Sequence, residues 1–268
     1  MVDIKDYRVS PGDKVHLDRM DTEDDGGLKR DEGEARFTKL VKRLQDLQEL
    51  MYAQHKHALL VVFQAMDAGG KDSTIRHVLG PLNPMGCRVT SFKGPNTVEQ
   101  DHDFLWRVHQ SAPRRGRIHV FNRSHYEDVL IVRVKGFAPE KVWRKRYEHI
   151  NAFEAMLGDE GTTVVKFYLH ISKGYQKERL QRRLDRPDKQ WKFNPNDLKE
   201  RAQWEAYQEA FTEALERCTT KDAPWYVVPA ERRWFRDLLV AEVLTETLES
   251  LKMKMPKVDF DASKIVIE

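Results

Sequence analysis

The chain has 268 residues, of which 40% are hydrophobic and 33% are charged. This length and composition suit one large α/β domain, and they exclude a collagen, a mucin-like stalk and a wholly disordered chain. The 46 Lys and Arg residues nearly balance the 43 Asp and Glu residues. The two cysteines, Cys87 and Cys218, lie far apart in the sequence and give no support to a disulfide framework or a zinc site.

No apolar run approaches the roughly 18 residues that span a membrane. The first ten residues also lack the charged and then apolar pattern of a signal segment. We therefore expect a soluble protein of the cytoplasm that has no membrane partner.

Charge is distributed unevenly along the chain. Residues 18–34 hold eight acids and three bases and include the Gly26-Gly27 pair, which suggests a flexible segment before the core. Residues 107–117 and 177–192 are basic, with seven bases against three acids in the second stretch. A solvated face explains either basic stretch taken alone. Together, in a nearly neutral chain, they favour an anionic ligand.

Hydrophobic spacing predicts an amphipathic helix over residues 37–51. Short apolar runs then predict strands at residues 58–64, 87–92, 117–122, 163–171 and 225–229. Helical spacing predicts further helices at residues 143–157, 207–218 and 235–251. Because apolar strands that alternate with helices are typical of a parallel sheet covered on both faces, the sequence predicts an α/β fold with about five parallel strands.

We expect three regions: an N-terminal segment (1–34), one α/β domain (35–255) and a C-terminal tail (256–268). Within the domain, residues 173–195 are too highly charged to belong to a core, and they lie between the last two predicted strands. We predict that they form a flap over the sheet edge.

The first predicted strand runs into a loop of small residues that precedes a helix. In such a loop, successive backbone N–H groups converge on phosphate oxygens and the helix adds positive potential. The candidate phosphate-binding residues are Ala68, Gly69, Gly70, Lys71, Asp72 and Ser73. Against the pattern G-x-x-x-x-G-K-[ST], the chain has Ala65 for the first glycine and Asp72 for the hydroxyl residue. An ordinary glycine-rich turn capped by Asp72 is the alternative.

Asp67 lies inside this loop, where a carboxylate repels phosphate unless a cation lies between them. Mg²⁺ takes one or two carboxylates together with phosphate oxygens, so Asp67 is the candidate magnesium ligand. The alternative is a turn-forming aspartate that binds its own backbone.

The loop occurs together with the segment 121–128 (FNRSHYED) at the end of the third predicted strand, and with segments 104–107, 191–193 and 223–229. In these motifs the chain closely resembles the polyphosphate kinase 2 family. The resemblance implies a three-layer, P-loop kinase-like domain with a helical lid, and phosphoryl transfer between inorganic polyphosphate and adenine nucleotides with Mg²⁺. It implies no nucleic-acid partner, and it implies a homo-oligomer, the common state of the family.

Asn122 distinguishes this chain within the resemblance, because many members of the family have an aspartate there. The Asn122-Arg123-Ser124 form, with Glu127 beyond it, is similar to the class III subgroup, which phosphorylates both AMP and ADP. The neutral Asn122 side chain is expected to orient a water or a phosphate, which leaves Asp67 and the phosphates to balance the metal charge.

The other candidates are charged side chains near the predicted sheet edge. Arg123 follows a strand directly and is expected to position phosphates, with a salt bridge on the sheet rim as the alternative. Glu127 either selects between nucleotides or caps the next helix, and Arg133 is expected to line the phosphate tract. In the predicted lid, four arginines fall at helical spacing on one face, and Arg179 and Arg183 are the leading catalytic candidates; the four are Arg179, Arg182, Arg183 and Arg186.

The leading functional hypothesis is a polyphosphate-dependent phosphotransferase that acts on AMP, ADP or both. It requires positioning and charge neutralisation rather than a nucleophile or a catalytic acid, which matches these residue types. Two alternatives are an ATP-dependent nucleoside monophosphate kinase of the same fold and a polyanion-binding module without turnover.

Overall fold

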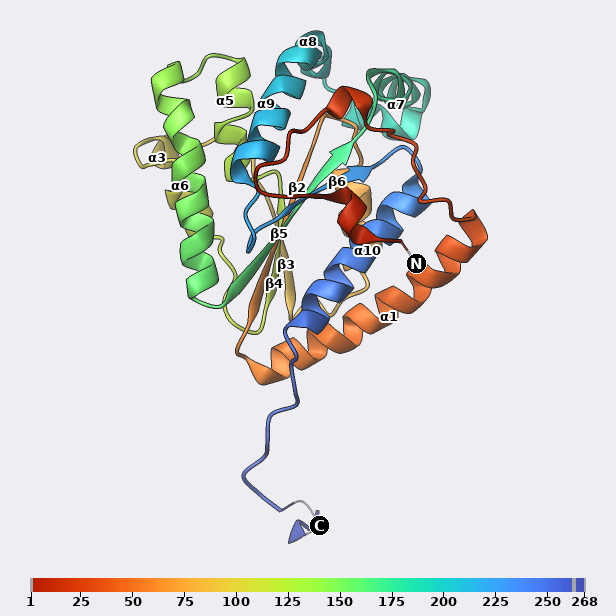
Figure 1. Cartoon of the computed structure of the whole chain (residues 1–268), viewed down its shortest axis with the longest axis vertical. Coiled ribbons are helices and arrows are strands. Elements are labelled where there is room, and N and C mark those ends of the chain that lie inside the picture. The colour runs from red at the N-terminus through yellow and green to blue at the C-terminus, as the bar shows by residue number, and fades with distance from the viewer. Residues whose placement is uncertain (1, 262–263, 268) are drawn as a thin grey trace.

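The computed structural model describes residues 2–261 and 264–267. Within them one sheet has six strands in the order β1-β6-β5-β2-β4-β3 (Figure 1). The strands are β1 Arg8–Val9, β2 Ala58–Ala65, β3 Cys87–Ser91, β4 Ile118–Asn122, β5 Thr162–His170 and β6 Trp225–Pro229. Strands β2 to β6 pair in parallel, as predicted, whereas β1 pairs antiparallel with β6. At two residues, β1 is too short to leave a pattern in the sequence.

The centre of the sheet is apolar because helices cover both of its faces. Every residue of β2 is buried, and the rings of Phe63 and Phe167 stack with centroids 5.2 Å apart across β2 and β5. A strand buried on both faces needs apolar side chains in both directions, which explains the unbroken run in the sequence.

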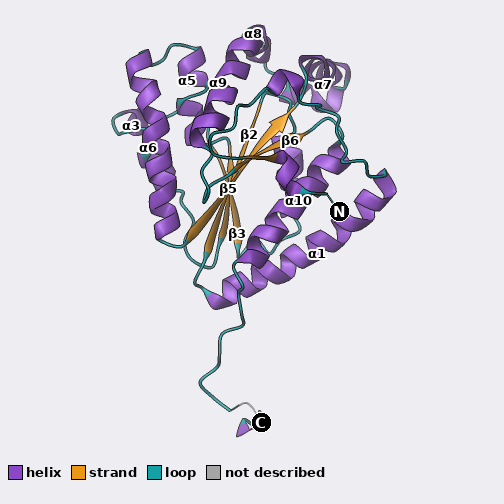
Figure 2. Cartoon of the chain, in the orientation of Figure 1, coloured by secondary structure: helices purple, strands orange, loops and turns teal. Residues whose placement is uncertain are grey.

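Four long helices form the two outer layers (Figures 1 and 2). On one side, α1 (Arg30–Gln54) packs along α10 (Arg233–Ser250). On the other side, α6 (Glu140–Asp159) lies beside α9 (Trp204–Cys218). Ion pairs between Arg36 and Glu242 and between Arg43 and Glu249 join α1 to α10.

Shorter helices fill the connections between these elements. They are η1 Ile4–Tyr7, η2 Leu17–Arg19, α2 Lys71–Thr74, η3 Ile75–Leu79, α3 Thr97–Gln100, α4 Trp106–His109, η4 His125–Asp128, α5 Ile131–Val134, α7 Lys173–Asp185, η5 Pro187–Lys192 and α8 Asn196–Ala202. The predicted flap thus consists of α7 and η5, at the same end of the sheet as α8 (Figure 1).

The N-terminal residues pack against the domain instead of forming the flexible segment that their acidic composition suggested. Val9 and Leu17 are buried in the core, and the Tyr7 hydroxyl donates to Asp24 at 2.6 Å. Helix α1 begins at Arg30, seven residues before the predicted helix. Within the acidic residues 18–34, Thr22 donates to Glu231 at 2.6 Å and Asp25 forms an ion pair with Arg232, so polar contacts hold this segment on the domain.

The chain beyond α10 extends away from the domain, with Phe260 exposed (Figure 1). Among the described residues, no helix combines the length and the apolar character that crossing a membrane requires. The end of the predicted tail at residue 268, and its residues 262 and 263, lie outside the described residues.

Gly33 and Gly158 offer a matched test of the packing between α1 and α10. A Cβ atom at Gly33 would lie 2.3 Å from the Trp234 ring, whereas nothing lies within 4 Å of one at Gly158. We expect Gly33→Ala to lower the free energy of unfolding by about 1–3 kcal/mol through overpacking. Gly158→Ala should raise it by up to about 1 kcal/mol, because alanine favours the helix. Denaturant titration measures both, and an unchanged Gly33→Ala protein would contradict the packing described here.

Candidate functional site

The site lies at the carboxyl edge of the sheet, where β2 and β4 end side by side. Phe63 of β2 is in register with Asn122 of β4, so the loop after β2 and the turn after β4 leave the sheet next to each other. Crevices at the carboxyl ends of parallel strands are the usual ligand sites of open α/β sheets.

The loop after β2 has the backbone of an anion-binding loop. Ala68 and Gly70 both have positive φ, at 66° and 99°, and residues with helical and left-handed conformations in succession turn their N–H groups toward a common point. A Cβ atom at Gly70 would lie 2.3 Å from Arg236 Nη1, and one at Gly69 would lie 2.7 Å from the Ala65 Cβ. Close packing behind the loop therefore requires both glycines.

Lys71 begins the helix after the loop and lines the cavity in front of it. Its side chain is almost fully buried, and its Nζ donates to the Ala65 carbonyl at 3.2 Å. Burial, followed by the nearby Arg123 charge, lowers the pKa of Lys71, although Asp67 and Glu127 oppose the change. The ammonium group is thus poorly solvated and available to an anion. Ser73 also lines the cavity, and its hydroxyl donates to the Gly70 carbonyl at 2.8 Å.

Arg123 joins the loop to the turn after β4. Its guanidinium contacts Asp67 Oδ1 at 2.9 Å and Glu127 Oε2 at 3.4 Å. The charge of Glu127, and then that of Asp67, raises the pKa of Arg123 against the effect of burial, so the group stays charged. The salt bridge on the sheet rim and the position at the phosphate loop, which were alternatives in the sequence, are both present.

Asn122 makes a contact that the sequence did not indicate. Its amide donates to Asp72 Oδ1 at 2.8 Å, and this bond joins the end of β4 to the start of α2. An aspartate at position 122 would place two carboxylates together, whereas the amide supplies a donor.

In front of the loop lies a cavity of about 740 Å³. Of the described residues that line it, eleven are Lys or Arg and two are Asp. The cations are Lys71, Arg76, Lys93, Arg123, Arg179, Arg182, Arg183, Arg186, Lys189, Lys192 and Arg233, and the acids are Asp67 and Asp72. All four arginines of the predicted stripe therefore face this cavity, as their helical spacing predicted.

Helix α7 is anchored to the phosphate loop and to α8. Gln176 donates to the Asp67 carbonyl at 2.9 Å, and Arg183 forms an ion pair with Asp197 at 3.2 Å. Burial and then the neighbouring Arg233 charge lower the pKa of Arg179, since cations crowd one another here. An anion in the cavity would relieve this repulsion.

A second cavity of about 210 Å³ adjoins the first and shares Asp67 and Arg123 with it. Its other walls are Glu127 and apolar or acidic residues of α5, α8 and α9, among them Ile131, Asp197, Glu200, Tyr207 and Phe211. The two cavities thus meet at the Asp67–Arg123 ion pair.

Arg133 does not join the site, contrary to the expectation that it lines the phosphate tract. It forms an ion pair with Glu213 of α9 and lies 4.7 Å over the Trp143 ring. The turn of α5 directs this side chain toward α9 instead of the sheet edge. The basic stretch 107–117 does not line either of these two cavities, and its Arg114 and Arg117 line a separate cavity beside Cys87 and His119.

Three cations of the cavity were missed in the sequence. Arg76 and Lys93 stand alone between predicted elements, and Arg233 follows the last strand by four residues. The rule that ligands bind at the carboxyl ends of parallel strands gave a signal for Arg233, because it lies just beyond such an end.

The acids of the cavity suit a magnesium ion that is shared with phosphates. Asp67 and Asp72 each use one carboxylate oxygen in the contacts above, and within the described residues the other oxygen has no hydrogen bond. The described residues contain no cluster of three or more His, Cys, Asp or Glu side chains that could enclose a metal. A site with one or two carboxylates is what Mg²⁺ uses when phosphates supply the remaining ligands.

Comparison with known proteins agrees with this geometry. Residues 27–256 match the family Polyphosphate kinase 2 (PPK2). An AMP/ADP-polyphosphate phosphotransferase from Meiothermus ruber is 52% identical over 99% of this chain and 100% of that protein. An ADP-polyphosphate phosphotransferase from Rhodopseudomonas palustris is 46% identical over 94% of this chain and 92% of that protein.

A solved structure is similar along nearly the whole fold. The crystal structure of polyphosphate kinase 2 from Arthrobacter aurescens TC1 superposes with a TM-score of 0.93 at 42% identity, covering 97% of this chain and 93% of that chain. A family match over most of the sequence, with relatives this similar along their full length, shows that the chain belongs to the polyphosphate kinase 2 family.

Proposed function

We propose that the chain transfers the terminal phosphoryl group of inorganic polyphosphate to AMP and ADP. The bond between the last phosphorus and its bridging oxygen breaks, and a bond forms from that phosphorus to a terminal phosphate oxygen of the nucleotide. The polyphosphate becomes one unit shorter, and the bridging oxygen retains the electron pair. The reverse direction uses the same groups.

The excess of positive charge in the larger cavity supports polyphosphate as the donor. Eleven cations against two acids exceed what one nucleotide triphosphate needs, and they continue from the phosphate loop along α7 and η5. An ATP-dependent kinase of this fold would need the loop but not the extension. A protein that only binds polyanions would not need the second cavity, which meets the first at Arg123.

The residues act by holding phosphates and neutralising their charge. The loop 67–72 and Lys71 bind the end of the donor chain, Arg123 orients the group in transfer, and the α7 arginines neutralise charge as it moves to the leaving phosphate. The attacking phosphate oxygen is already anionic near neutral pH, so no general base is required. The smaller cavity takes the acceptor nucleotide, with its phosphates at Arg123, whose guanidinium is paired with Glu127.

Asp67 would hold Mg²⁺ together with phosphate oxygens, and Asp72 lines the same cavity. When bound, the ion neutralises phosphate charge between donor and acceptor. Asn122 contributes by fixing the Asp72 carboxylate through its amide.

The use of both AMP and ADP follows from the Asn122 variant and from the relatives named above, one of which is an AMP/ADP-polyphosphate phosphotransferase. The homo-oligomeric state, the cytoplasmic location and the closing of residues 173–195 as a lid stay predictions. Light scattering of the purified protein measures the first of them.

The proposed reaction has a direct assay. The protein is incubated with ADP, polyphosphate and Mg²⁺ without ATP, and the nucleotides are separated by chromatography. ATP should form, and AMP supplied in place of ADP should give ADP. Formation of no ATP, with phosphorylation of a nucleotide when ATP is the donor, would assign the chain to the ATP-dependent kinases instead.

Lys71→Ala should reduce turnover about a hundredfold or more in a folded protein, because one preorganised donor at the reacting group is lost.

The lowered pKa of Lys71 also predicts how the activity of the wild-type protein changes with pH. Lys71 carries its charge below its lowered pKa and loses it as the pH rises, so kcat/KM for polyphosphate should fall at a lower alkaline pH than an ordinary lysine would allow. The residual activity of the variant should lack this decline. A folded variant with a nearly normal rate would exclude this role.

Asp67→Asn should raise the magnesium concentration for half-maximal rate by about tenfold or more, since the anionic metal ligand is replaced by a neutral amide. Magnesium titration of the initial rate measures this shift. Asp46→Asn, an exposed acid of α1, is the matched control and should leave the titration unchanged. An unshifted curve for Asp67→Asn would make Asp67 a turn residue.

Arg179→Ala should lower kcat by roughly a hundredfold or more while the nucleotide KM changes little, because its charge is needed most during transfer. Lysine should restore only part of the rate, since it lacks the planar fork of guanidinium. Steady-state kinetics of Arg179→Ala, Arg179→Lys and the exposed control Arg115→Ala measure the effect. Equal rates for Arg179→Ala and Arg115→Ala would show that α7 presents a solvated face.

A further inference from the structure

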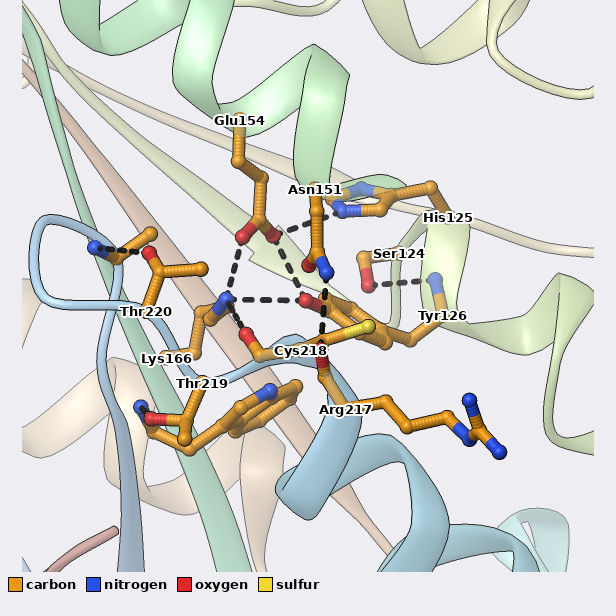
Figure 3. A network of polar contacts seen from close by, with 12 residues as sticks. Ser124, His125, Tyr126, Asn151, Glu154, Lys166, Arg217, Cys218, Thr219 and Thr220 are labelled. Atoms are coloured by element: carbon orange, nitrogen blue, oxygen red, sulfur yellow. Dashed lines mark hydrogen bonds and ion pairs between the residues drawn. The ribbon is translucent and has the colours of Figure 1, made fainter. Parts of the chain in front are cut away.

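A buried ion pair lies behind the turn that carries Arg123. Glu154 of α6 and Lys166 of β5 are in direct contact, and their side chains are 1% and 0% exposed (Figure 3). Neither residue lines either cavity of the site. Charges are seldom buried without a partner, and replacing such a pair by apolar residues often does not reduce stability. Stability alone therefore does not explain why this ion pair is buried here.

Both members of this pair form several hydrogen bonds with their neighbours. Lys166 Nζ donates to Glu154, to the Tyr126 hydroxyl at 3.0 Å and to the Cys218 carbonyl at 2.6 Å, which accounts for all three donors of the ammonium group. Glu154 Oε1 accepts from the Tyr126 hydroxyl at 2.9 Å and lies 3.2 Å from His125 Nε2. Figure 3 shows these contacts converging from α6, β5, α9 and the turn after β4.

The Glu154 carboxylate is held in its charged form. Burial alone would raise the pKa of Glu154, but the Lys166 charge and the hydrogen bond from His125 outweigh burial and lower it. A fixed anion thus faces the two residues of the turn that reach into the core, His125 and Tyr126.

The turn needs such an anchor because its backbone is strained. Arg123 has a φ of 61°, in the left-handed region that an L residue seldom adopts. A conformation of this kind persists when the surrounding structure over-determines it. Arg123 N–H donates to the Phe63 carbonyl at 3.1 Å, which fixes one side of the strained residue to β2.

A second tether from β2 acts on the same turn. With its amide nitrogen facing Glu127, Gln64 donates to Glu127 Oε1 at 3.0 Å and accepts from Ser124 Oγ at 3.1 Å. The turn is therefore held from β2 through Gln64 and from α6 through Glu154. Arg123 directly precedes these attachments and Glu127 is itself one of them. Both residues line the smaller cavity.

We propose that the Glu154–Lys166 pair is a positioning device for phosphoryl transfer, which fixes His125 and Tyr126 and through them the guanidinium of Arg123. The proposal rests on the role given to Arg123 above. The pair touches no substrate. A loosened turn would misalign Arg123 with the group in transfer, which lowers turnover, while the remaining walls of the smaller cavity still bind nucleotide.

Tyr126→Phe and Glu154→Gln are the test variants. Tyr126→Phe removes one tether and keeps the ion pair and the ring, so the protein should fold even if Glu154→Gln does not. Tyr168→Phe is the matched control, because Tyr168 is also fully buried and its hydroxyl bonds Gln208 on α9. Each protein is assayed below its measured unfolding temperature for kcat and for the nucleotide KM with ADP and polyphosphate.

We expect Tyr126→Phe to lower kcat roughly three- to tenfold, the equivalent of one hydrogen bond. Glu154→Gln should lower it more, the nucleotide KM should change less than about twofold, and Tyr168→Phe should retain the wild-type rate. A folded Tyr126→Phe protein with wild-type kcat would overturn the proposal. So would an equal loss in Tyr168→Phe, because the loss would then reflect general loosening of the core.

A double-mutant cycle with Arg123→Ala separates positioning from a purely structural role. If the pair acts through Arg123, Tyr126→Phe should cost no further turnover, within about twofold, once Arg123 is alanine. Equal losses in both backgrounds would overturn the proposal while leaving the role of Arg123 intact. Wild-type turnover of Arg123→Ala alone would instead refute the role of Arg123 on which the proposal rests.

Discussion

Mutual repulsion among cations is the constraint on which the site depends. Eleven Lys and Arg side chains of the described chain face one cavity that contains only two carboxylates. Each pair of like charges a few ångströms apart is unfavourable by about 1 kcal/mol in water and more where solvent is excluded. A folded protein holds such a set together when the rest of the fold fixes the backbone and an anionic ligand supplies the missing charge.

The parallel sheet supplies the fixed backbone. The register of β2 with β4 brings the phosphate loop and the Arg123 turn to one edge, and β5 and β6 bring α7 and Arg233 to the same edge. The strands set the position of this edge, whereas the loops and helices that follow them carry the charged side chains. Behind the edge, Arg236 packs against the loop glycine, and Glu154 with Lys166 holds the turn. The positive φ angles of Ala68 and Arg123 thus occur at this supported edge of the sheet.

Much of this architecture could be predicted from local sequence patterns. The apolar runs predicted the five parallel strands, of which β2, β4, β5 and β6 are mostly buried whereas β3, at the edge of the sheet, is largely exposed. The spacing of Arg179 with Arg183 predicted the charged face of α7. The small residues before Lys71 gave the phosphate loop. The sequence could not reveal the role of a residue whose partner lies far away along the chain. Glu154 in the sequence is one acid on a helix, and only the fold places it beside Lys166. Arg133 was misplaced because its partner Glu213 is 80 residues away, and β1 is defined only by β6.

The salt dependence of polyphosphate binding tests the central claim most directly. Equilibrium binding of a long polyphosphate is measured from low to moderate salt for the wild type and for variants with one, two and three of the stripe arginines replaced by alanine. If the cavity holds the chain by ion pairing, the logarithm of the affinity should fall steeply with the logarithm of the salt concentration, and each replacement should reduce the slope by about one. AMP should show a much shallower slope. A slope that is the same for polyphosphate and AMP, or that the replacements leave unchanged, would contradict an arginine-lined polyphosphate track.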